Sequence, residues 1–271
     1  MVESIIPTEL TKADVLRYLK TDKVNIDVQR CVTSTNTILK SLANEGMPEG
    51  FALIAEEQTA GRGRLGRTFH SPPGTGLYFS ILLRPTISAE RSLFITTAAA
   101  VAVCRAIEDM TDEKPMIKWV NDIYLNERKI CGILTEGAAD FGTGGLRWAV
   151  LGIGINLAPP TGGFPEEIQN IAGSLYTEPC PVEKRAELVA GVIDHFMAMY
   201  EDIGTGAFIN DYRARSFLTG REIVFSIGND TYSGVVTGIS DEAHLTVRLS
   251  NGEERAFSAG EVQIHKGFAK C

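Results

Sequence analysis

The apolar pattern of the chain changes near residue 218, and this change restricts the fold more than any other feature of the sequence. Before it, helical stretches alternate with short strand-like runs, and the longest helical stretch covers residues 181–203. After Gly220, apolar and polar residues alternate in four short runs at 222–227, 233–239, 245–249 and 254–257. A chain of 271 residues is long enough for one large and one small domain. We therefore predict an α+β domain over residues 1–217 and a small barrel-like β domain over residues 218–271.

The first domain is expected to combine helices with a sheet of short strands. Thr11 is a candidate N-cap for a first helix, with Val15 and Leu16 on its apolar side. Further helices are predicted from residue 34 to a stop near Gly46 and at 92–109, 181–203 and 208–217, with strands at 24–28, 51–55, 77–83, 116–119, 123–125, 129–135 and 147–156. In the second domain, the pair Asn251 and Gly252 predicts a type I′ hairpin turn.

The charge balance argues against a general nucleic-acid binder. The net charge is -8 and the pI is near 5.2, whereas phosphate binding needs a basic face. No stretch reaches the roughly 18 apolar residues of a membrane span. The longest candidate, residues 93–107, is interrupted by Thr96, Thr97 and Arg105, which predicts a buried helix. We expect no nucleic-acid partner and no membrane partner.

The cysteines indicate a reducing compartment. None of the five forms a C-x-x-C pair, and none lies near one of the four histidines at metal-ligand spacing. Near the N-terminus, Glu3 and Glu9 interrupt the basic and apolar pattern of a secretory signal. These observations predict a cytoplasmic protein with free thiols and no structural zinc.

A glycine-rich loop at residues 59–76 carries clustered positive charge in this acidic chain. Its segment 61–67 reads GRGRLGR. Glycines let backbone N–H groups turn toward a ligand, and guanidinium groups suit phosphate and carboxylate oxygens. A solvated basic loop is the alternative. The segment predicts an anion-binding site when other charged motifs accompany it.

Two lysines flank a second polar segment, in which residues 118–125 read KWVNDIYL and 129–134 read KICGIL. Lys118 and Lys129 are candidate phosphate ligands, although surface lysines are common. Asn121 and Asp122 supply an amide and a carboxylate where a hydrated Mg²⁺ could bridge to phosphate oxygens. The alternative for Asp122 is a turn-forming role.

A third motif, GIGIN at residues 152–156, lies within an apolar strand. It lacks the third glycine and the following helix of a dinucleotide fingerprint, so we reject a Rossmann site. Glycines within a strand indicate that another backbone or a ligand comes close.

In combination and order, these motifs resemble those of the biotin protein ligases. The matching segments are STN at 34–36, EQTAGRGR at 57–64, GLYFS at 76–80, KWVND at 118–122, KICGIL at 129–134 and GIGIN at 152–156. The resemblance covers nearly the whole chain. It implies a catalytic domain with a mixed sheet like that of class II aminoacyl-tRNA synthetases, followed by an SH3-like β-barrel.

The resemblance also implies roles for single residues. The implied biotin-binding residues are Ser34, Thr35, Asn36, Gln58, Gly61, Arg62, Gly63, Arg64, Lys129 and Gly132. The implied ATP-binding residues are Arg62, Arg64, Arg67, Lys118, Trp119, Asn121, Asp122, Lys129 and Asn156. Arg62, Arg64 and Lys129 are the implied catalytic residues, and Asp122 is the implied Mg²⁺ ligand. Ser34 is also a candidate helix N-cap, and Asn156 a candidate strand-end cap.

Two positions depart from the family pattern. Val120 stands where the lysine-tryptophan motif usually continues with proline, which removes no charge. Near the C-terminus, His265 and Lys266 stand where some members have an arginine that reaches the nucleotide. This departure puts a contact between the C-terminal module and ATP in doubt.

The implied reaction is an ATP-dependent ligation in two steps. The biotin carboxylate attacks the α-phosphorus of ATP with Mg²⁺, and a lysine of a biotin carboxyl carrier domain, as in acetyl-CoA carboxylase, then attacks biotinyl-5′-AMP. The alternatives are a lipoate or octanoate ligase and a biotin-sensing transcriptional repressor. The residues before Ser34 are expected to form one helix and one strand, too little for a DNA-reading domain. The family resemblance allows a homodimer.

Overall fold

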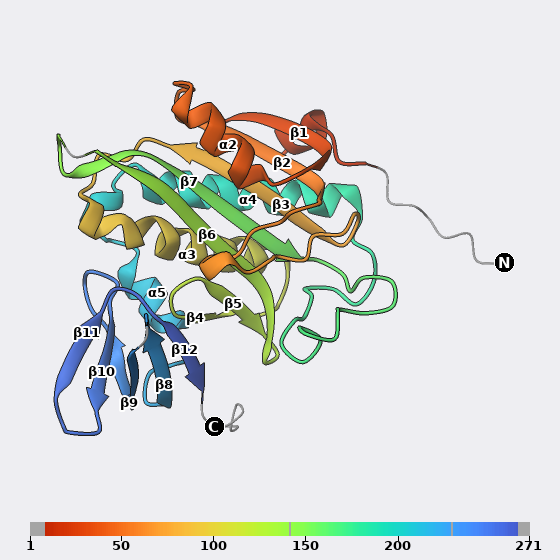
Figure 1. Cartoon of the computed structure of the whole chain (residues 1–271). Coiled ribbons are helices and arrows are strands. Elements are labelled where there is room, and N and C mark those ends of the chain that lie inside the picture. Colours follow the sequence, from red (N-terminus) through yellow and green to blue (C-terminus); the bar gives the residue numbers. More distant parts are fainter. Residues whose placement is uncertain (1–8, 141, 229, 265–271) are drawn as a thin grey trace.

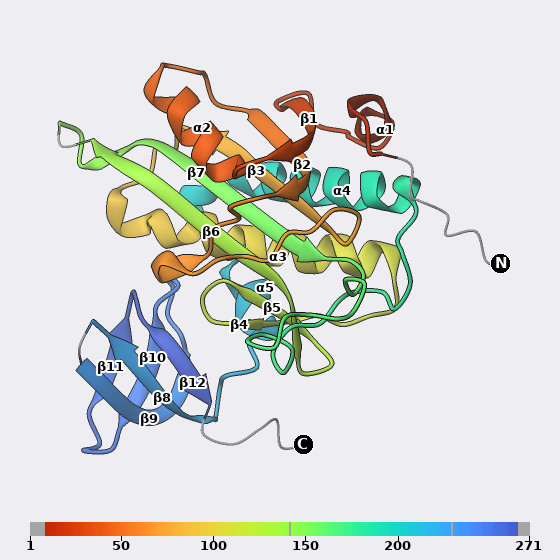
Figure 2. The ribbon, with the colours of Figure 1, turned by 45° about the vertical axis from the view of Figure 1, so that its right-hand side comes forward.

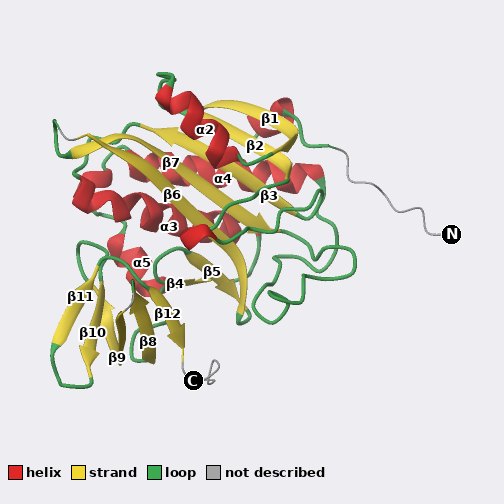
Figure 3. Cartoon of the chain, viewed as in Figure 1, coloured by secondary structure: helices red, strands yellow, loops and turns green. Residues whose placement is uncertain are grey.

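Two sheets follow one another along the chain in the computed structural model, which describes residues 9–140, 142–228 and 230–264 (Figure 1; Figure 3). The larger sheet has seven strands in the order β1-β2-β3-β7-β6-β5-β4, and the smaller has five in the order β11-β10-β9-β8-β12. The larger sheet contains β1 (Asn25–Val32), β2 (Phe51–Gln58), β3 (Gly76–Leu83), β4 (Met116–Lys118), β5 (Asp122–Leu125), β6 (Arg128–Asp140) and β7 (Gly145–Asn156). The smaller contains β8 (Glu222–Ile227), β9 (Asp230–Ile239), β10 (Leu245–Leu249), β11 (Glu254–Phe257) and β12 (Glu261–Ile264).

Helices cover both faces of the larger sheet (Figure 2). Helices α3 (Leu93–Met110) and α4 (Val182–Tyr200) pack together on one face, and α2 (Thr35–Asn44) lies on the other. Because side chains alternate along a strand, Ala52 and Ile54 of β2 join the core beneath α3 and α4, whereas Leu53 joins the core beneath α2. Burial on both faces explains why the central strands are apolar throughout. The two shorter helices are α1 (Lys12–Leu16) and α5 (Ile209–Arg215).

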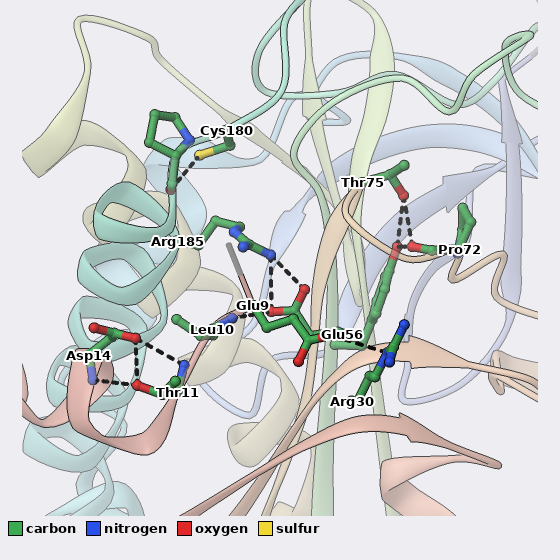
Figure 4. Close-up of polar contacts among 12 residues, drawn as sticks. Glu9, Leu10, Thr11, Asp14, Arg30, Glu56, Pro72, Thr75, Cys180 and Arg185 are labelled. Carbon is green, nitrogen blue, oxygen red and sulfur yellow. Dashed lines mark hydrogen bonds and ion pairs between the residues drawn. The ribbon is translucent and has the colours of Figure 1, made fainter. Parts of the chain in front are cut away.

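The N-terminal segment is attached to the sheet by a buried ion pair (Figure 4). Arg185 of α4 lies 2.8 Å from Glu56 of β2, and Glu56 also accepts a hydrogen bond from the backbone N–H of Leu10 at 3.0 Å. Thr11 and Asp14 form a capping box that begins α1. Helix α4, strand β2 and the start of the described chain therefore meet at one carboxylate.

Hydrogen bonds join the smaller sheet to the larger one. The indole N–H of Trp119 donates to the carbonyl of Ala243 at 2.9 Å, and Arg213 of α5 donates to the carbonyl of Ile239 at 2.7 Å. Together these contacts fix the smaller sheet beside the β4–β5 end of the larger one (Figure 1).

Most predicted elements are present, and the predicted α+β class is confirmed. Helix α3 is a buried helix, as expected, and no helix in the described ranges is long and apolar enough to cross a bilayer. Strands β2 and β6 are longer than predicted, and β12 was not predicted. The prediction that Leu16 lies on the buried side of α1 was wrong, because Leu16 is 48% exposed.

The predicted type I′ turn is also wrong. Of its two residues only Gly252 has a positive φ, 86°, whereas a type I′ turn needs two. Two consecutive residues with positive φ occur instead between β5 and β6, where Asn126 and Glu127 have φ of 48° and 64°. This turn brings Lys129 back beside the end of β5.

Candidate active site

One cavity collects the residues that the sequence analysis selected. Its volume of about 740 Å³ falls within the range of small-molecule sites. The predicted residues that line it are Ser34, Thr35, Asn36, Gln58, Arg62, Gly63, Arg64, Arg67, Lys118, Trp119, Asn121, Asp122, Lys129, Gly132 and Asn156. Gly61 lies just outside, where an added Cβ would stand 2.4 Å from the carbonyl oxygen of Phe69. Gly61 thus allows close packing within the loop.

The GRGR loop is a small hairpin over the cavity. Arg62 forms a bridge with Thr68, and the backbone N–H of Gly63 donates to the carbonyl of Arg67 at 2.7 Å. The expectation that glycine N–H groups face a ligand is therefore wrong for Gly63, whose N–H is used within the hairpin. The arginine side chains, rather than this N–H, remain to bind an anion.

Uncharged polar groups form one end of the cavity. Ser34, Thr35 and Asn36 at the start of α2 have 2%, 3% and 4% of their surface exposed. Ser34 caps the helix, because its hydroxyl accepts a hydrogen bond from the N–H of Thr37. Thr35 donates from its backbone N–H to the Gln58 side chain at 2.9 Å. This contact joins the start of α2 to the end of β2.

Asn36 is the centre of that polar end. Its Oδ1 accepts a hydrogen bond from the hydroxyl of Ser80 at 2.6 Å, and its Nδ2 donates to Glu136 at 3.1 Å. An added Cβ on Gly152 would lie 2.0 Å from Asn36 Oδ1, so only glycine fits beneath this amide. The close approach predicted for the GIGIN motif is therefore made by a side chain of the chain itself.

Phe69 forms an apolar floor beside the polar end. An added Cβ would lie 2.5 Å from its ring at Gly154 and 3.0 Å at Gly132. Phe69 lines the cavity, whereas Ser80 and Glu136 form hydrogen bonds with the Asn36 side chain at the polar end. The sequence analysis missed all three residues. The glycines in two neighbouring strands were the signal that a bulky group lies above them.

Cationic side chains form the opposite end. Lys129 Nζ lies 2.6 Å from Asp122 Oδ1. Burial lowers the pKa of Lys118, and the nearby carboxylate of Asp122 offsets part of this effect. Arg62 lines the cavity as well, with its side chain 49% exposed, but it lies toward the polar end, 3.5 Å from Glu136. An anionic ligand would meet several positive charges here.

Arg64 joins the hairpin to two other parts of the site. Its guanidinium donates to Asn121 Oδ1 at 2.9 Å and to the carbonyl of Gly260 at 3.2 Å. Asn121 in turn donates to the carbonyl of Ile133 at 2.9 Å. Arg67 pairs with Glu261 of β12. The smaller sheet therefore contributes to the cavity wall, while His265 and Lys266 lie outside the described residues.

Asn156 positions a segment of the wall. Its Nδ2 donates to the carbonyl of Gly173 at 3.0 Å, and the N–H of Gly173 donates to the carbonyl of Lys129 at 2.9 Å. Ile168 and Ile171 of the same segment line the cavity. The amide of Asn156 therefore forms a hydrogen bond at the end of β7, as the capping alternative predicts, and Asn156 is also one of the residues that line the cavity.

The acidic groups suit a metal only in part. Within the ranges that the structure describes, no group of three or more acidic, histidine or cysteine side chains is placed to hold a metal ion. Asp122 supplies one carboxylate at the cationic end. One carboxylate is enough for an Mg²⁺ ion held mainly by water and substrate phosphates.

Comparison with known proteins matches both parts of the chain. Residues 28–156 match the Biotin/lipoate A/B protein ligase family, and residues 219–264 match the Biotin protein ligase C terminal domain. The bifunctional ligase/repressor BirA of Bacillus spizizenii is 33% identical over 258 residues, which are 93% of this chain and 79% of that protein. The chain belongs to the biotin protein ligase family. The biotin–[acetyl-CoA-carboxylase] ligase of Paracoccus denitrificans is 31% identical over 82% of this chain and 93% of that protein.

A solved structure of the family has the same fold. The biotin protein ligase from Aquifex aeolicus in complex with biotin and ATP is 27% identical, with a TM-score of 0.72 over 90% of this chain and 99% of that one. The predicted mixed sheet with helices and the separate C-terminal β sheet are thereby confirmed. At the position where the family motif usually has proline, Val120 is buried and its carbonyl accepts a hydrogen bond from the hydroxyl of Tyr212.

Proposed function

We propose that this biotin protein ligase uses ATP to activate biotin as biotinyl-5′-AMP and transfers it to a lysine of a biotin carboxyl carrier domain, such as that of acetyl-CoA carboxylase. The observation that carries the proposal is a cavity with an uncharged polar end, an apolar floor at Phe69 and a cationic end at Lys129. Biotin has a polar ureido ring, an apolar tail and a carboxylate in the same order.

The cationic end serves the first step. A carboxylate oxygen of biotin attacks the α-phosphorus of ATP, and pyrophosphate leaves. Bringing two anions together is unfavourable, so Lys129, Arg62 and Arg64 stabilise the charge that develops on the transferring group. Asp122 would hold Mg²⁺, which when bound would offset the charge of the ATP phosphates. In the second step the neutral acceptor amine attacks the biotinyl carbonyl carbon, an amide forms, and AMP leaves.

The polar end favours biotin over lipoate. Thr35 and Asn36 are buried, and buried polar groups lose hydrogen bonds when a ligand offers no partner. The ureido ring offers N–H donors and a carbonyl acceptor, whereas the dithiolane ring of lipoate offers neither. A site built to hydrogen-bond one group rejects an analogue without it by a factor on the order of 10⁴.

ATP–pyrophosphate exchange tests this function directly. Exchange should require biotin and Mg²⁺ and proceed without a carrier domain, since adenylation comes first. Labelled biotin should then reach an added carrier domain. Exchange supported equally well by lipoate would contradict the assignment to biotin.

Three further statements belong to this proposal. We place the division between the domains at residues 217 and 218, since every strand of the larger sheet precedes it and every strand of the smaller sheet follows it. We propose a cytoplasmic location, in keeping with the free thiols of Cys104, Cys131 and Cys180. The repressor alternative is not favoured, because a net charge of -8 opposes DNA binding. A gel shift that survives competitor DNA at about 150 mM salt would overturn this last statement.

A further inference from the structure

Glu136 lies behind the polar end of the cavity and contacts three side chains there. Its Oε2 accepts a hydrogen bond from Asn36 Nδ2 at 3.1 Å, and its Oε1 accepts one from Lys40 Nζ at 2.6 Å. Arg62 Nη2 lies 3.5 Å from the same Oε1. Glu136 is not among the cavity-lining residues, so any effect on a ligand must act through its neighbours.

The carboxylate of Glu136 is ionised and can only accept hydrogen bonds. Burial raises the pKa of Glu136, but hydrogen bonds from Lys40 and Asn36 and the charges of Lys40 and Arg62 outweigh burial and hold the pKa below its ordinary value. The backbone carbonyl of Leu134, 3.3 Å from Asn36 Nδ2, is likewise an acceptor. Two acceptors on one side require the NH₂ group of Asn36 to face them.

The opposite edge of the amide is thereby fixed as an acceptor. The two ends of an asparagine amide have nearly the same shape, so only hydrogen-bond partners decide its orientation. With Nδ2 directed at Glu136, Oδ1 faces Ser80 and Gly152, and Asn36 is one of the residues that line the cavity. A reversed amide would place Oδ1 against the Glu136 carboxylate and the Leu134 carbonyl, where it has no donor.

We propose that Glu136 is a positioning residue that holds Asn36 Oδ1 toward the cavity as an acceptor and thereby selects a ligand with an N–H donor at this end. The proposal rests on the proposed function, in which that ligand group is the ureido ring of biotin. Glu136 sets the polarity of the site without touching the substrate.

Lys40 provides a matched control for the charge of Glu136. Its side chain is 31% exposed, and its Nζ donates a hydrogen bond to Glu136 Oε1 at 2.6 Å, while Asn36 binds the other oxygen, Oε2. Lys40→Met removes the ion pair but leaves the Asn36–Glu136 hydrogen bond. Glu136→Gln removes the ion pair and also offers an NH₂ group that can donate a hydrogen bond to Oδ1 of a reversed Asn36.

The test measures equilibrium binding and exchange kinetics with biotin and with its two singly N-methylated derivatives. For Glu136→Gln we expect the biotin KM to rise about tenfold, while the kcat and the KM for ATP stay within about twofold of the parent. The parent should bind one of the two N-methylated derivatives less well than the other. In Glu136→Gln the preference for biotin over that derivative should fall about tenfold. Lys40→Met should keep that preference. A merely structural role for Glu136 would lower activity with every ligand alike and leave the preference unchanged.

The outcomes separate this inference from the function on which it rests. A parent protein that neither binds biotin nor shows biotin-dependent exchange overturns the proposed function. A parent that does both, with unchanged ligand preference in Glu136→Gln, overturns only the role of Glu136. If the Gln variant fails to fold in thermal unfolding, Glu136→Asp replaces it, since Asp keeps the charge for Lys40 but withdraws the acceptor from Asn36. A folded Asp variant with the parent's preference also overturns the proposal.

Discussion

Lys129 Nζ lies 2.6 Å from Asp122 Oδ1, so the cation and the carboxylate expected at the ATP phosphates pair with each other. The pairing follows from local structure. Asn126 and Glu127 form the tight turn after β5, and this turn returns the chain so that Lys129 stands beside Tyr124 in the ladder. A phosphate that enters the site would compete with Asp122 for Lys129.

Lys129→Ala should reduce biotin adenylation by a factor of about 10² or more, because it removes a group that stabilises developing charge in a site sheltered from water. ATP–pyrophosphate exchange measures the effect. Lys114→Ala is the matched control, since Lys114 is exposed and lies outside the cavity. Near-normal exchange in the Lys129 variant would show that Lys129 is a surface charge.

The sequence was sufficient to predict the cavity but not its supporting residues. Motif residues such as Asn36 and Lys129 can be recognised because the motifs that contain them match those of the biotin protein ligases in sequence and in order. Glu136 follows one of these motifs in an ordinary strand pattern, and its role depends on Asn36, which is 100 positions away in the chain. Only the fold brings the two together. Phe69 is similar, because its role is defined by the glycines beneath it on β6 and β7.

The conformations of two tight turns could not be predicted from residue preferences either. The pair Asn251 and Gly252 fits a type I′ turn by residue preference, yet the turn formed there has one positive φ. Asn126 and Glu127, which contain no glycine, form the type I′ geometry because the pairing of β5 with β6 requires a two-residue connection. Strand pairing therefore accounts for the turn at Asn126 and Glu127.

Arg185→Met should lower the free energy of unfolding by about 3 kcal/mol or more, because removing one partner of a buried pair leaves the other charge uncompensated. Arg185 is 1% exposed, and in its absence Glu56 would keep the Leu10 N–H as a hydrogen-bond donor. Urea unfolding followed by circular dichroism gives the loss. The double variant Arg185→Met with Glu56→Gln should recover part of it, and a double variant no more stable than the single one would contradict this account.

The pH dependence of stability should report the ionisation of Glu136. Its pKa in the folded protein is below the ordinary value of 4.5, so its stabilising contribution is present above that value and is lost as the pH falls through the folded pKa. The difference in free energy of unfolding between the parent and Glu136→Gln should therefore shrink as the pH falls below 4.5. The other carboxylates are present in both proteins, so their contributions cancel in this difference in free energy of unfolding. A difference that is constant from about pH 7 to about pH 4 would show that Glu136 has no depressed pKa.

Arg64 should control how long biotinyl-5′-AMP stays bound. Its guanidinium links the GRGR hairpin to Asn121 and to the carbonyl of Gly260, so it attaches the hairpin to both walls of the cavity. Ordering a glycine-containing loop over a ligand is entropically costly, and these hydrogen bonds offset part of that cost. Arg64→Gly removes them while leaving Arg62 and Lys129 in place. We expect the hairpin to open sooner and the adenylate to escape.

Escaped adenylate gives this prediction two independent measurements. Rapid filtration should show faster dissociation of biotinyl-5′-AMP from Arg64→Gly. Because a mixed anhydride in water reacts with exposed lysines, added serum albumin should become biotinylated in proportion to its concentration. Arg64→Lys is the matched control, since it keeps the charge but cannot contact Asn121 and Gly260 with one planar group. If the charge alone retained the adenylate, the Lys variant would behave as the parent. A Gly variant whose dissociation rate stays within about twofold of the parent, an effect below about 0.4 kcal/mol, would remove the role assigned to Arg64.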